Sequence, residues 1–234
     1  MRTSAWMSRL YVWIIYSLSF SLFAVSLMAS CRTASEETLF IRWENMPAVP
    51  PRTGDSIQPG LAGPVAGALG ESMFVAGGSN FPDRLPWKGG AKHYHDDLYL
   101  LKRVNQLWVW EVQTSKLPIN LAYPACISIA DGTVSLGGEN ESGPVQNVYR
   151  YGLKEGQVTI TPLPSLPIAI SAGGAACVGS DVFFTGGYNN KGASAGFFHL
   201  NLKTPENGWE QLPNMPVPLS HPLVVSQNDP TGPC

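Results

Sequence analysis

Charged residues and helix-like periodicity are both scarce in this sequence. Only 14% of the 234 residues are charged and the net charge is −2, whereas the sequence has 24 glycines and 20 prolines. This weak and slightly acidic charge balance excludes the basic surface that nucleic-acid binding needs. The missing helical period, together with the many glycines and prolines, predicts an all-β protein of short strands and tight turns.

Long apolar runs are also absent, with one exception at the N-terminus. Residues 10–28 carry no charge, follow Arg2 and Arg9, and lead into Ala29-Ser30-Cys31. This pattern predicts an export segment over residues 1–31, followed by a polar tether over 32–38. Small residues before a cysteine resemble the bacterial lipoprotein signal, so we expect a lipid on Cys31 and a location in the periplasm or at the outer membrane. Ordinary cleavage near Ala29 and an uncleaved membrane anchor are the alternatives.

One short phrase occurs three times: a few strand-forming residues that end in a pair of glycines. The pairs are Gly77-Gly78, Gly137-Gly138 and Gly186-Gly187. Two consecutive glycines weaken a strand and permit a positive φ, so each pair marks a strand end where the backbone turns sharply. The intervals of about 60 and about 50 residues match the period of kelch-type propeller blades.

A second phrase keeps the same period. An aromatic or β-branched residue precedes x-x-(Met/Leu)-Pro-x-x-Pro at Trp43, Ile160 and Trp209, and a looser copy runs from Trp110 to Pro118. Two phrases that share one period predict a kelch-type β-propeller. A β-sandwich with evenly spaced turns is the alternative.

The repeats divide the chain into about three and a half blades. Residues 39–43 form a lone strand, which in kelch rings closes the circle by pairing with strands from the other end of the chain. Whole blades follow at 44–118, 119–167 and 168–216, and residues 217–234 begin an incomplete blade with an inner strand over 219–226. Small residues should line the axis, and large apolar residues should fill the space between sheets. In the first blade these are Phe74, Leu98, Leu100, Trp108 and Trp110.

Two of the remaining cysteines lie in predicted strands. Export permits a disulfide, but Cys126 and Cys177 occupy small-residue strand positions that are offset by two in the repeat. We therefore predict that both are buried free thiols.

The residues directly after the glycine pairs are candidates for a binding site. In a propeller these loops gather on one face around the central channel, so their side chains converge. Amide side chains both donate and accept hydrogen bonds, which suits a sugar, although asparagine after a glycine pair also tolerates a left-handed turn. The candidate segments are Ser79-Asn80-Phe81, Glu139-Asn140 and Tyr188-Asn189-Asn190. The predicted site residues within them are Asn80, Phe81, Glu139, Asn140 and Asn189.

The first blade carries an insertion at residues 79–96. Its tryptophan, cationic residues and two histidines offer an aromatic platform and positive charges to a carboxylated sugar, and we expect Trp87 and His93 to lie over the channel mouth. His93 and His95 have no third cluster of ligands near them in the sequence, so no metal is predicted; His95 and Asp96 are equally suited to capping the third strand. The further binding candidates are Arg84, Trp87, Lys88 and His93.

This insertion and its flanks resemble the bacterial N-acetylneuraminate epimerases, or sialic acid mutarotases. The similar segments run from Phe74 to Pro82, from Leu85 to Lys92 and from Tyr94 to Tyr99. The blade with the insertion comes first, as in the cyclically permuted branch of that family. The resemblance spans roughly Trp43 to the C-terminus. It implies a six-bladed kelch propeller in the periplasm that converts α- to β-N-acetylneuraminate, with no cofactor.

The implied reaction opens the sugar ring. It requires a base for the anomeric hydroxyl, an acid for the ring oxygen and a cation for the carboxylate. The resemblance implies that a glutamate and an arginine in a Gly-Glu-x-x-x-Gly-x-Arg phrase have these roles. The partial match here begins at Gly138-Glu139 and has Val145 in place of the arginine. Glu139 is therefore the catalytic candidate, with the main catalytic blade expected in residues that this chain does not contain.

Two other classes compete with this interpretation. A non-catalytic surface lipoprotein whose kelch face binds glycan or protein is the first, because fold alone does not fix function. A galactose-oxidase-like copper enzyme is the second, but it needs clustered tyrosine, histidine and a tyrosine-linked cysteine that the sequence does not supply. Six blades of about 49 residues exceed this chain, so we expect a partial protein with unpaired sheet edges, prone to aggregation and inactive alone.

Overall fold

The computed structural model describes residues 41, 43–52, 54–229 and 232–233, in two units that divide after Asn45. The predicted export segment and tether lie outside these residues, as does most of the predicted lone strand 39–43; Ile41 and Trp43 themselves are in no strand. The following description concerns the second unit, Met46–Cys234. Within the described part of the chain, no helix has the length and apolar character needed to cross a membrane.

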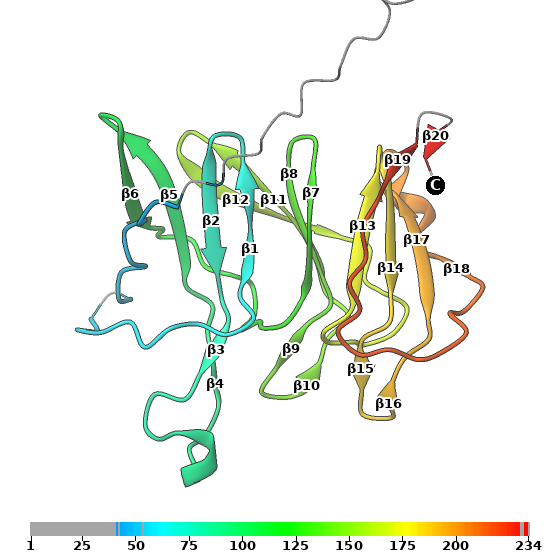
Figure 1. Cartoon of the computed structure of the whole chain (residues 1–234), viewed down its shortest axis with the longest axis horizontal. Helices are drawn as coiled ribbons and strands as arrows, with labels where there is room; N and C mark the ends of the chain where they lie inside the picture. Colours follow the sequence, from blue (N-terminus) through cyan, green and yellow to red (C-terminus); the bar gives the residue numbers. More distant parts are fainter. Residues whose placement is uncertain (1–40, 42, 53, 230–231, 234) are drawn as a thin grey trace, which may run out of the picture. The chain divides into compact units, whose positions relative to one another are not determined.

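Three four-stranded antiparallel sheets build this unit (Figure 1). Neighbouring strands follow one another in chain order within each sheet, as expected for propeller blades. The first sheet comprises β1 (Val65–Leu69), β2 (Ser72–Ala76), β5 (Leu98–Val104) and β6 (Leu107–Val112). The second comprises β7 (Ala125–Ile129), β8 (Gly132–Leu136), β11 (Val148–Lys154) and β12 (Gln157–Leu163). The third comprises β13 (Gly174–Val178), β14 (Asp181–Thr185), β17 (Phe197–Asn201) and β18 (Glu210–Leu212).

A small two-stranded hairpin follows each glycine pair, and Figure 1 shows the three hairpins at the same end of the sheets. The hairpins are β3 (Ser79–Asn80) with β4 (His93–Tyr94), β9 (Glu139–Asn140) with β10 (Gly143–Pro144), and β15 (Tyr188–Asn189) with β16 (Gly192–Ala193). The remaining elements are the short 3-10 helices η1 (Pro86–Lys88) and η2 (Pro205–Asn207), and a fourth hairpin of β19 (Asn228–Asp229) with β20 (Gly232–Pro233).

The first glycine of each pair is required by both its conformation and its surroundings. Gly77 and Gly137 both have a φ of 62°. A Cβ on Gly137 would lie 2.4 Å from the carbonyl oxygen of Ile170, and one on Gly77 would lie 2.4 Å from that of Leu121. The glycine pairs therefore allow each sheet to lie close to the backbone of the next repeat. Any residue with a Cβ at these positions would force the backbone to shift.

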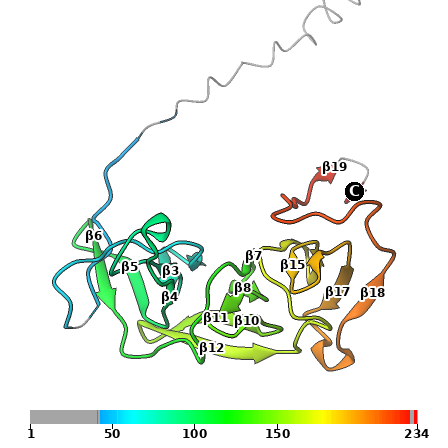
Figure 2. The same ribbon diagram turned by 90° about the horizontal axis from the view of Figure 1, so that it is seen from below.

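The two spaces between consecutive sheets are filled by apolar side chains, and Figure 2 shows the three sheets following one another along an open arc. Between the first and second sheets, Phe74 packs on Tyr151 with ring centroids 5.0 Å apart, and both side chains are at most 1% exposed. Small residues are needed beside the axis, because a Cβ on Gly67 of β1 would lie 2.1 Å from Thr133 of β8. The second space is filled by Val134, Leu136, Val182, Phe184 and Phe198 together with their neighbours.

The large apolar residues predicted for the first blade divide into two groups. Phe74, Leu98 and Leu100 are buried, as predicted. Trp108 and Trp110 are only half-buried, because they lie on the outermost strand β6. The Trp110 indole donates instead to the carbonyl of Pro47 at 2.8 Å, and Trp209 makes the same bond to Pro164 in the third blade. In both blades a tryptophan in or directly before the fourth strand thus bonds to the proline phrase that precedes the blade.

The inner strand predicted over 219–226 does not form among the described residues. Only its first part keeps the repeat geometry. Gly187 donates to the carbonyl of Leu219 as Gly78 does to Leu121 and Gly138 to Ile170. Beyond this point Leu223 is 91% exposed and Val225 is 74% exposed, and among the described residues the segment pairs with no second strand.

Cys126 and Cys177 carry free thiols, as predicted. Both are half-buried by residue rather than fully buried. Burial of its thiol raises the pKa of Cys126 to about 11, so the group is an unreactive thiol near neutral pH.

Candidate functional site

The residues after the glycine pairs occupy one equivalent position in the three blades. Ser79, Glu139 and Tyr188 each make an antiparallel bridge with the stretch that enters their own blade, to Ala62, Ala122 and Ser171 respectively. The repeat therefore presents three different side chains on one scaffold, at the end of the sheets where the small hairpins lie (Figure 1).

The centre of this end is the carboxylate of Glu139. Its Oε1 accepts from Lys92 Nζ at 2.7 Å and from the Tyr94 hydroxyl at 2.8 Å. Its Oε2 accepts from the Tyr188 hydroxyl. Only 6% of Glu139 is exposed, and the three donors stabilise the negative charge of this buried carboxylate. Lys92 and Tyr94 come from the first blade, Glu139 from the second and Tyr188 from the third, so three blades meet on one carboxylate. We call these four residues the Glu139 cluster.

Aromatic rings surround the cation of this cluster. Lys92 Nζ lies 4.3 Å from the ring centroid of Tyr123 and 4.9 Å from that of Tyr94. The ring of Tyr188 stacks on His221 at 6.2 Å. Such rings attract a cation through their negative faces. Lys92 is therefore held by a carboxylate and two rings at once.

The electrostatics of the cluster favour a fully charged pair. Burial alone would raise the pKa of Glu139, but hydrogen bonds from Lys92, Tyr188 and Tyr94 leave it below its ordinary value. Burial alone would lower the pKa of Lys92, but the bond to Glu139 raises it above its ordinary value. The pKa values of Tyr94 and Tyr188 are raised, first by burial and then by the adjacent carboxylate. At neutral pH the cluster thus holds an ionised glutamate, a protonated lysine and two neutral phenols.

A chain of residues with left-handed backbone runs beside the cluster. Gly63, Tyr123, Ala172 and His221 have φ values of 57°, 55°, 50° and 55°. Three backbone hydrogen bonds link these residues in sequence. The amide of Tyr123 donates to the carbonyl of Gly63 at 2.7 Å, that of Ala172 to Tyr123 at 3.0 Å, and that of His221 to Ala172 at 2.9 Å. A non-glycine residue with such a φ is strained and persists only where its surroundings hold it. This left-handed chain holds the rings of Tyr123 and His221 next to Lys92 and Tyr188.

The β3–β4 hairpin separates two sets of side chains by simple alternation. Successive residues of a strand point to opposite faces. Lys92 and Tyr94 therefore face the Glu139 cluster, while His93 and His95 face the other way. On β3, Ser79 faces Tyr123, with its Oγ 3.4 Å from the Tyr123 hydroxyl, and Asn80 faces the histidines.

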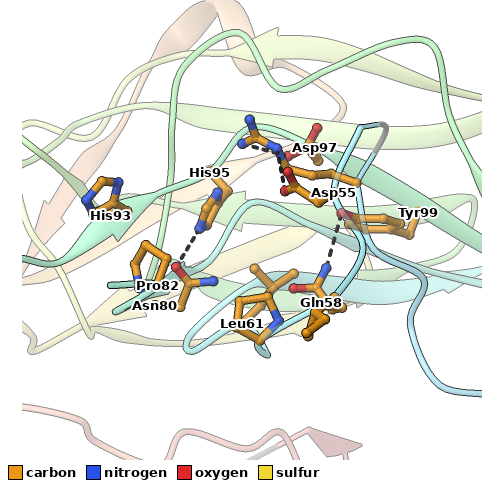
Figure 3. A pocket seen from close by; sticks show the side chains of 12 residues that line it. Asp55, Gln58, Leu61, Asn80, Pro82, His93, His95, Asp97 and Tyr99 are labelled. Carbon is orange, nitrogen blue, oxygen red and sulfur yellow. Dashed lines mark hydrogen bonds and ion pairs between the residues drawn. The ribbon is translucent and has the colours of Figure 1, made fainter. Parts of the chain in front are cut away.

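The outer face of this hairpin lines a cavity of about 230 Å³ on the first blade (Figure 3). The other walls are formed by Arg52 and residues within 54–61, by Asp97 and by the β5 residue Tyr99. Figure 3 shows His95 directed at Asn80, and the Nε2–Oδ1 distance between them is 2.9 Å. We call this space the first-blade cavity. It receives two of the predicted binding residues, Asn80 and His93.

The other predicted residues lie apart from both places. Asn140 and Asn189 each use Oδ1 to accept the backbone amide two residues later, at 2.9 and 2.8 Å, so their side chains stabilise their own turns. Trp87 and Lys88 form η1 at the tip of the insertion, where Trp87 is 76% exposed. Phe81 is half-buried and Arg84 is exposed. The structure thus places Glu139 at the cluster, two residues at the cavity and the rest on turns or at the insertion tip.

Sequence reasoning did not single out four residues that surround Glu139: Lys92, Tyr94, Tyr123 and His221. The alternation Lys92-His93-Tyr94-His95 was a usable signal, because it separates the two faces of a strand. A second signal was the repetition of Leu121-Ala122-Tyr123 as Leu219-Ser220-His221. In the described residues, no group of three or more histidine, cysteine or acidic side chains is arranged to hold a metal ion.

Comparison with known proteins gives a consistent result. The chain is 29% identical over 161 residues to an N-acetylneuraminate epimerase of Vibrio vulnificus, covering 63% of this chain and 41% of that protein. It is 34% identical over 110 residues to one from Brucella melitensis, covering 43% and 27%. For one from Salmonella arizonae the values are 30% over 132 residues, covering 51% and 32%. The chain thus spans less than half the length of these curated relatives. No protein-family model matches it.

The repeated sheets, glycine pairs and proline phrases define a kelch-type β-propeller, here with three sheets that do not close into a ring within the described residues. Over the aligned parts, the chain is similar to bacterial N-acetylneuraminate epimerases, and this similarity supports a relationship to that family.

Proposed function

We propose that the hairpin end of this chain binds N-acetylneuraminate and takes part in the interconversion of its α and β anomers. The support is twofold. The similar proteins are named N-acetylneuraminate epimerases, and the chain gathers a buried carboxylate, a lysine and two phenols from three blades at one place. The Glu139 cluster is the observation that carries the proposal.

The substrate carboxylate would compete with Glu139 for Lys92. N-acetylneuraminate carries a carboxylate on its anomeric carbon, and the lysine is the cation nearest to Glu139 in the described residues. If the substrate takes over Lys92, the bond that lowers the pKa of Glu139 weakens while its burial remains. The pKa of Glu139 then rises, so the same carboxylate becomes a better base for the anomeric hydroxyl. Binding of substrate would thereby activate the base.

The phenols supply the proton that the ring oxygen needs. Tyr94 and Tyr188 are neutral donors, and both already point at the carboxylate. As Glu139 takes the proton of the anomeric hydroxyl, one phenol protonates the ring oxygen and the bond from that oxygen to the anomeric carbon breaks. Ring closure on the other face of the carbonyl returns the proton of the ring hydroxyl to the phenolate and the proton of Glu139 to the anomeric oxygen. No cofactor enters this scheme, because only protons move between substrate and side chains.

A second candidate is binding of sialylated glycan without catalysis. Val145 occupies the place of the arginine in the epimerase phrase, and Glu139 is held in an ion pair that weakens it as a base. Both observations favour a cluster that recognises the sugar and leaves its ring closed.

One set of NMR measurements separates the candidates. N-acetylneuraminate is titrated into the full chain, and the rate of α–β exchange is read from magnetisation transfer between the anomers. Both candidates predict binding that Lys92→Met weakens. An exchange rate above the spontaneous one, reduced by Glu139→Gln, supports the epimerase; the spontaneous rate with intact binding supports the glycan-binding protein. Absence of binding by the folded wild type would contradict both.

Export and lipid attachment belong to the same proposal. They rest on the N-terminal segment, which ends in Ala29-Ser30-Cys31 and resembles a bacterial lipoprotein signal. Metabolic labelling with a palmitate analogue is expected to mark the wild type and not Cys31→Ser. An unlabelled wild type recovered outside the cytoplasm would instead favour ordinary cleavage.

A further inference from the structure

The walls of the first-blade cavity are held together by specific side-chain hydrogen bonds. The segment made of Arg52 and residues 54–61 forms one wall, and these residues lie in no strand. Side-chain hydrogen bonds hold it on the first sheet: Gln58 Nε2 donates to the Tyr99 hydroxyl at 3.3 Å, and Asn80 Nδ2 donates to the carbonyl of Gly60 at 3.0 Å. The cavity therefore keeps its shape through bonds between three separate segments (Figure 3).

The charges around the cavity oppose an anionic ligand. Arg52 is the arginine in its wall, and it already pairs with Asp55 at 3.1 Å and lies 3.9 Å from Asp97. Two carboxylates thus face one guanidinium. A ligand carboxylate would have to displace one of them and approach the other, and like charges at such distances repel. The Glu139 cluster differs, because Lys92 there pairs with one carboxylate and a ligand anion would have to displace only that group.

The hydrogen-bonding groups suit hydroxyls. Asn80 donates through Nδ2, so its Oδ1 accepts from His95, and Nε2 of that imidazole must carry a hydrogen. Burial, the largest influence, lowers the pKa of His95, so the ring is neutral and its Nδ1 is an acceptor. Asp55 adds carboxylate acceptors, and His93 and Arg52 add donors. A hydroxyl is both donor and acceptor and can pair with all of these groups.

The cavity also has an apolar side. Leu61 and Pro82 lie in its wall, and Ile57 lies there while 72% exposed. An exposed isoleucine at the rim of a polar cavity offers a surface for the C–H face of a ring. A mixed wall of this kind fits a pyranose, which has hydroxyls around its edge and C–H groups on its faces.

We propose that the first-blade cavity is a binding site for one neutral sugar ring, distinct from the Glu139 cluster. The size supports a single ring, because about 230 Å³ is below the range of roughly 300–1,000 Å³ that drug-sized ligands occupy. The two sites share the β3–β4 hairpin, whose residues alternate between them. A glycan with a neutral sugar beside a carboxylated one would meet a site for each on the two faces of one hairpin.

The test uses methyl β-galactopyranoside and methyl α-glucopyranoside as neutral probes and N-acetylneuraminate as the charged probe. Each is titrated into the full chain, with saturation-transfer NMR as readout. We expect saturable binding of at least one neutral hexoside. Asp55→Ala and His95→Gln should each weaken it about tenfold, because each removes a partner for a hydroxyl. Asp55 is half exposed, so this variant should fold even if His95→Gln does not.

The matched control is Tyr94→Phe. Tyr94 lies between His93 and His95 in the sequence, but its side chain faces the Glu139 cluster and not the cavity. This variant should leave hexoside binding unchanged and weaken N-acetylneuraminate. The proposal is overturned if neither hexoside binds the folded wild type, if Asp55→Ala leaves the affinity unchanged, or if Tyr94→Phe weakens both kinds of sugar equally. Hexoside binding in a chain that does not bind N-acetylneuraminate would support the cavity and contradict the proposed function, so the two can fail separately.

Discussion

The first and second hairpins have the same backbone frame and opposite chemistry. Gly77 donates to the carbonyl of Asp97 as Gly137 does to Asn147, and His95 donates to Gly78 as Val145 does to Gly138. The second hairpin closes at once through Gly143–Pro144, whereas the first carries residues 81–92 between its strands. Donors project from the first hairpin and the acceptor projects from the second. The repeat therefore provides positions, and the side chains that break the repeat provide the site.

The largest expected effect tests the shared frame. Gly137→Ala should destabilise the protein by about 2–4 kcal/mol, because the new Cβ has both an unfavourable φ of 62° and a carbonyl oxygen at 2.4 Å. Chemical denaturation monitored by tryptophan fluorescence gives the value.

Gly156→Ala is its matched control. That glycine has a φ of 77° with nothing within 4 Å of a Cβ, so only the conformational cost of about 1–2 kcal/mol applies. Equal losses in the two variants would show that the close approach to the next repeat does not matter.

A smaller effect tests the acceptor of the second hairpin. Glu139→Gln should lower the free energy of unfolding by about 2 kcal/mol, because it removes the charge that pairs with Lys92. Glu141→Gln in the same hairpin removes only the charge of an exposed acceptor of Asn120 and should change stability by less than about 0.5 kcal/mol. A loss in Glu141→Gln as large as that in Glu139→Gln would contradict the central role given to Glu139.

The pH dependence sharpens the same point. The pKa of Glu139 is lower in the folded state than its ordinary value of 4.5. Its contribution to stability is therefore fully present above pH 4.5 and is lost as the pH falls through the folded pKa. Unfolding free energies measured in steps from pH 6 to pH 3 should fall less steeply in Glu139→Gln than in the wild type. Parallel curves would show that Glu139 titrates alike in the folded and unfolded chain.

The smallest effect tests the insertion of the first hairpin. Trp87 is 76% exposed on η1, so Trp87→Ala should leave stability within about 0.5 kcal/mol. If Trp87 supplies an aromatic platform for the ligand, calorimetric titration should show that Trp87→Ala binds N-acetylneuraminate more weakly than the wild type by more than about 1 kcal/mol. Unchanged affinity would give the insertion tip a structural role only.

The sequence predicted the fold better than the site, for physical reasons. Glycine pairs and proline phrases are local signals, so the all-β fold with repeated antiparallel sheets was predicted correctly. The strand over 219–226 was wrong, because its pairing depends on a neighbouring strand and not on its own residues. The Glu139 cluster joins residues 45 to 49 positions apart, and no local pattern reports such contacts. The usable signals were the alternation in Lys92-His93-Tyr94-His95 and the repetition of Leu121-Ala122-Tyr123 as Leu219-Ser220-His221.

The left-handed chain gives this protein an internal reporter of how its repeats are joined. The amides of Tyr123, Ala172 and His221 do not bond within their own sheets but cross from one repeat to the next. In hydrogen exchange, their protection measures the separation of neighbouring repeats, whereas amides inside a sheet measure the melting of that sheet. Exchange at these three positions that is faster than in β8 and β14 would mean that the repeats part before they unfold. Equal rates would mean that the three sheets come apart and unfold as one cooperative body.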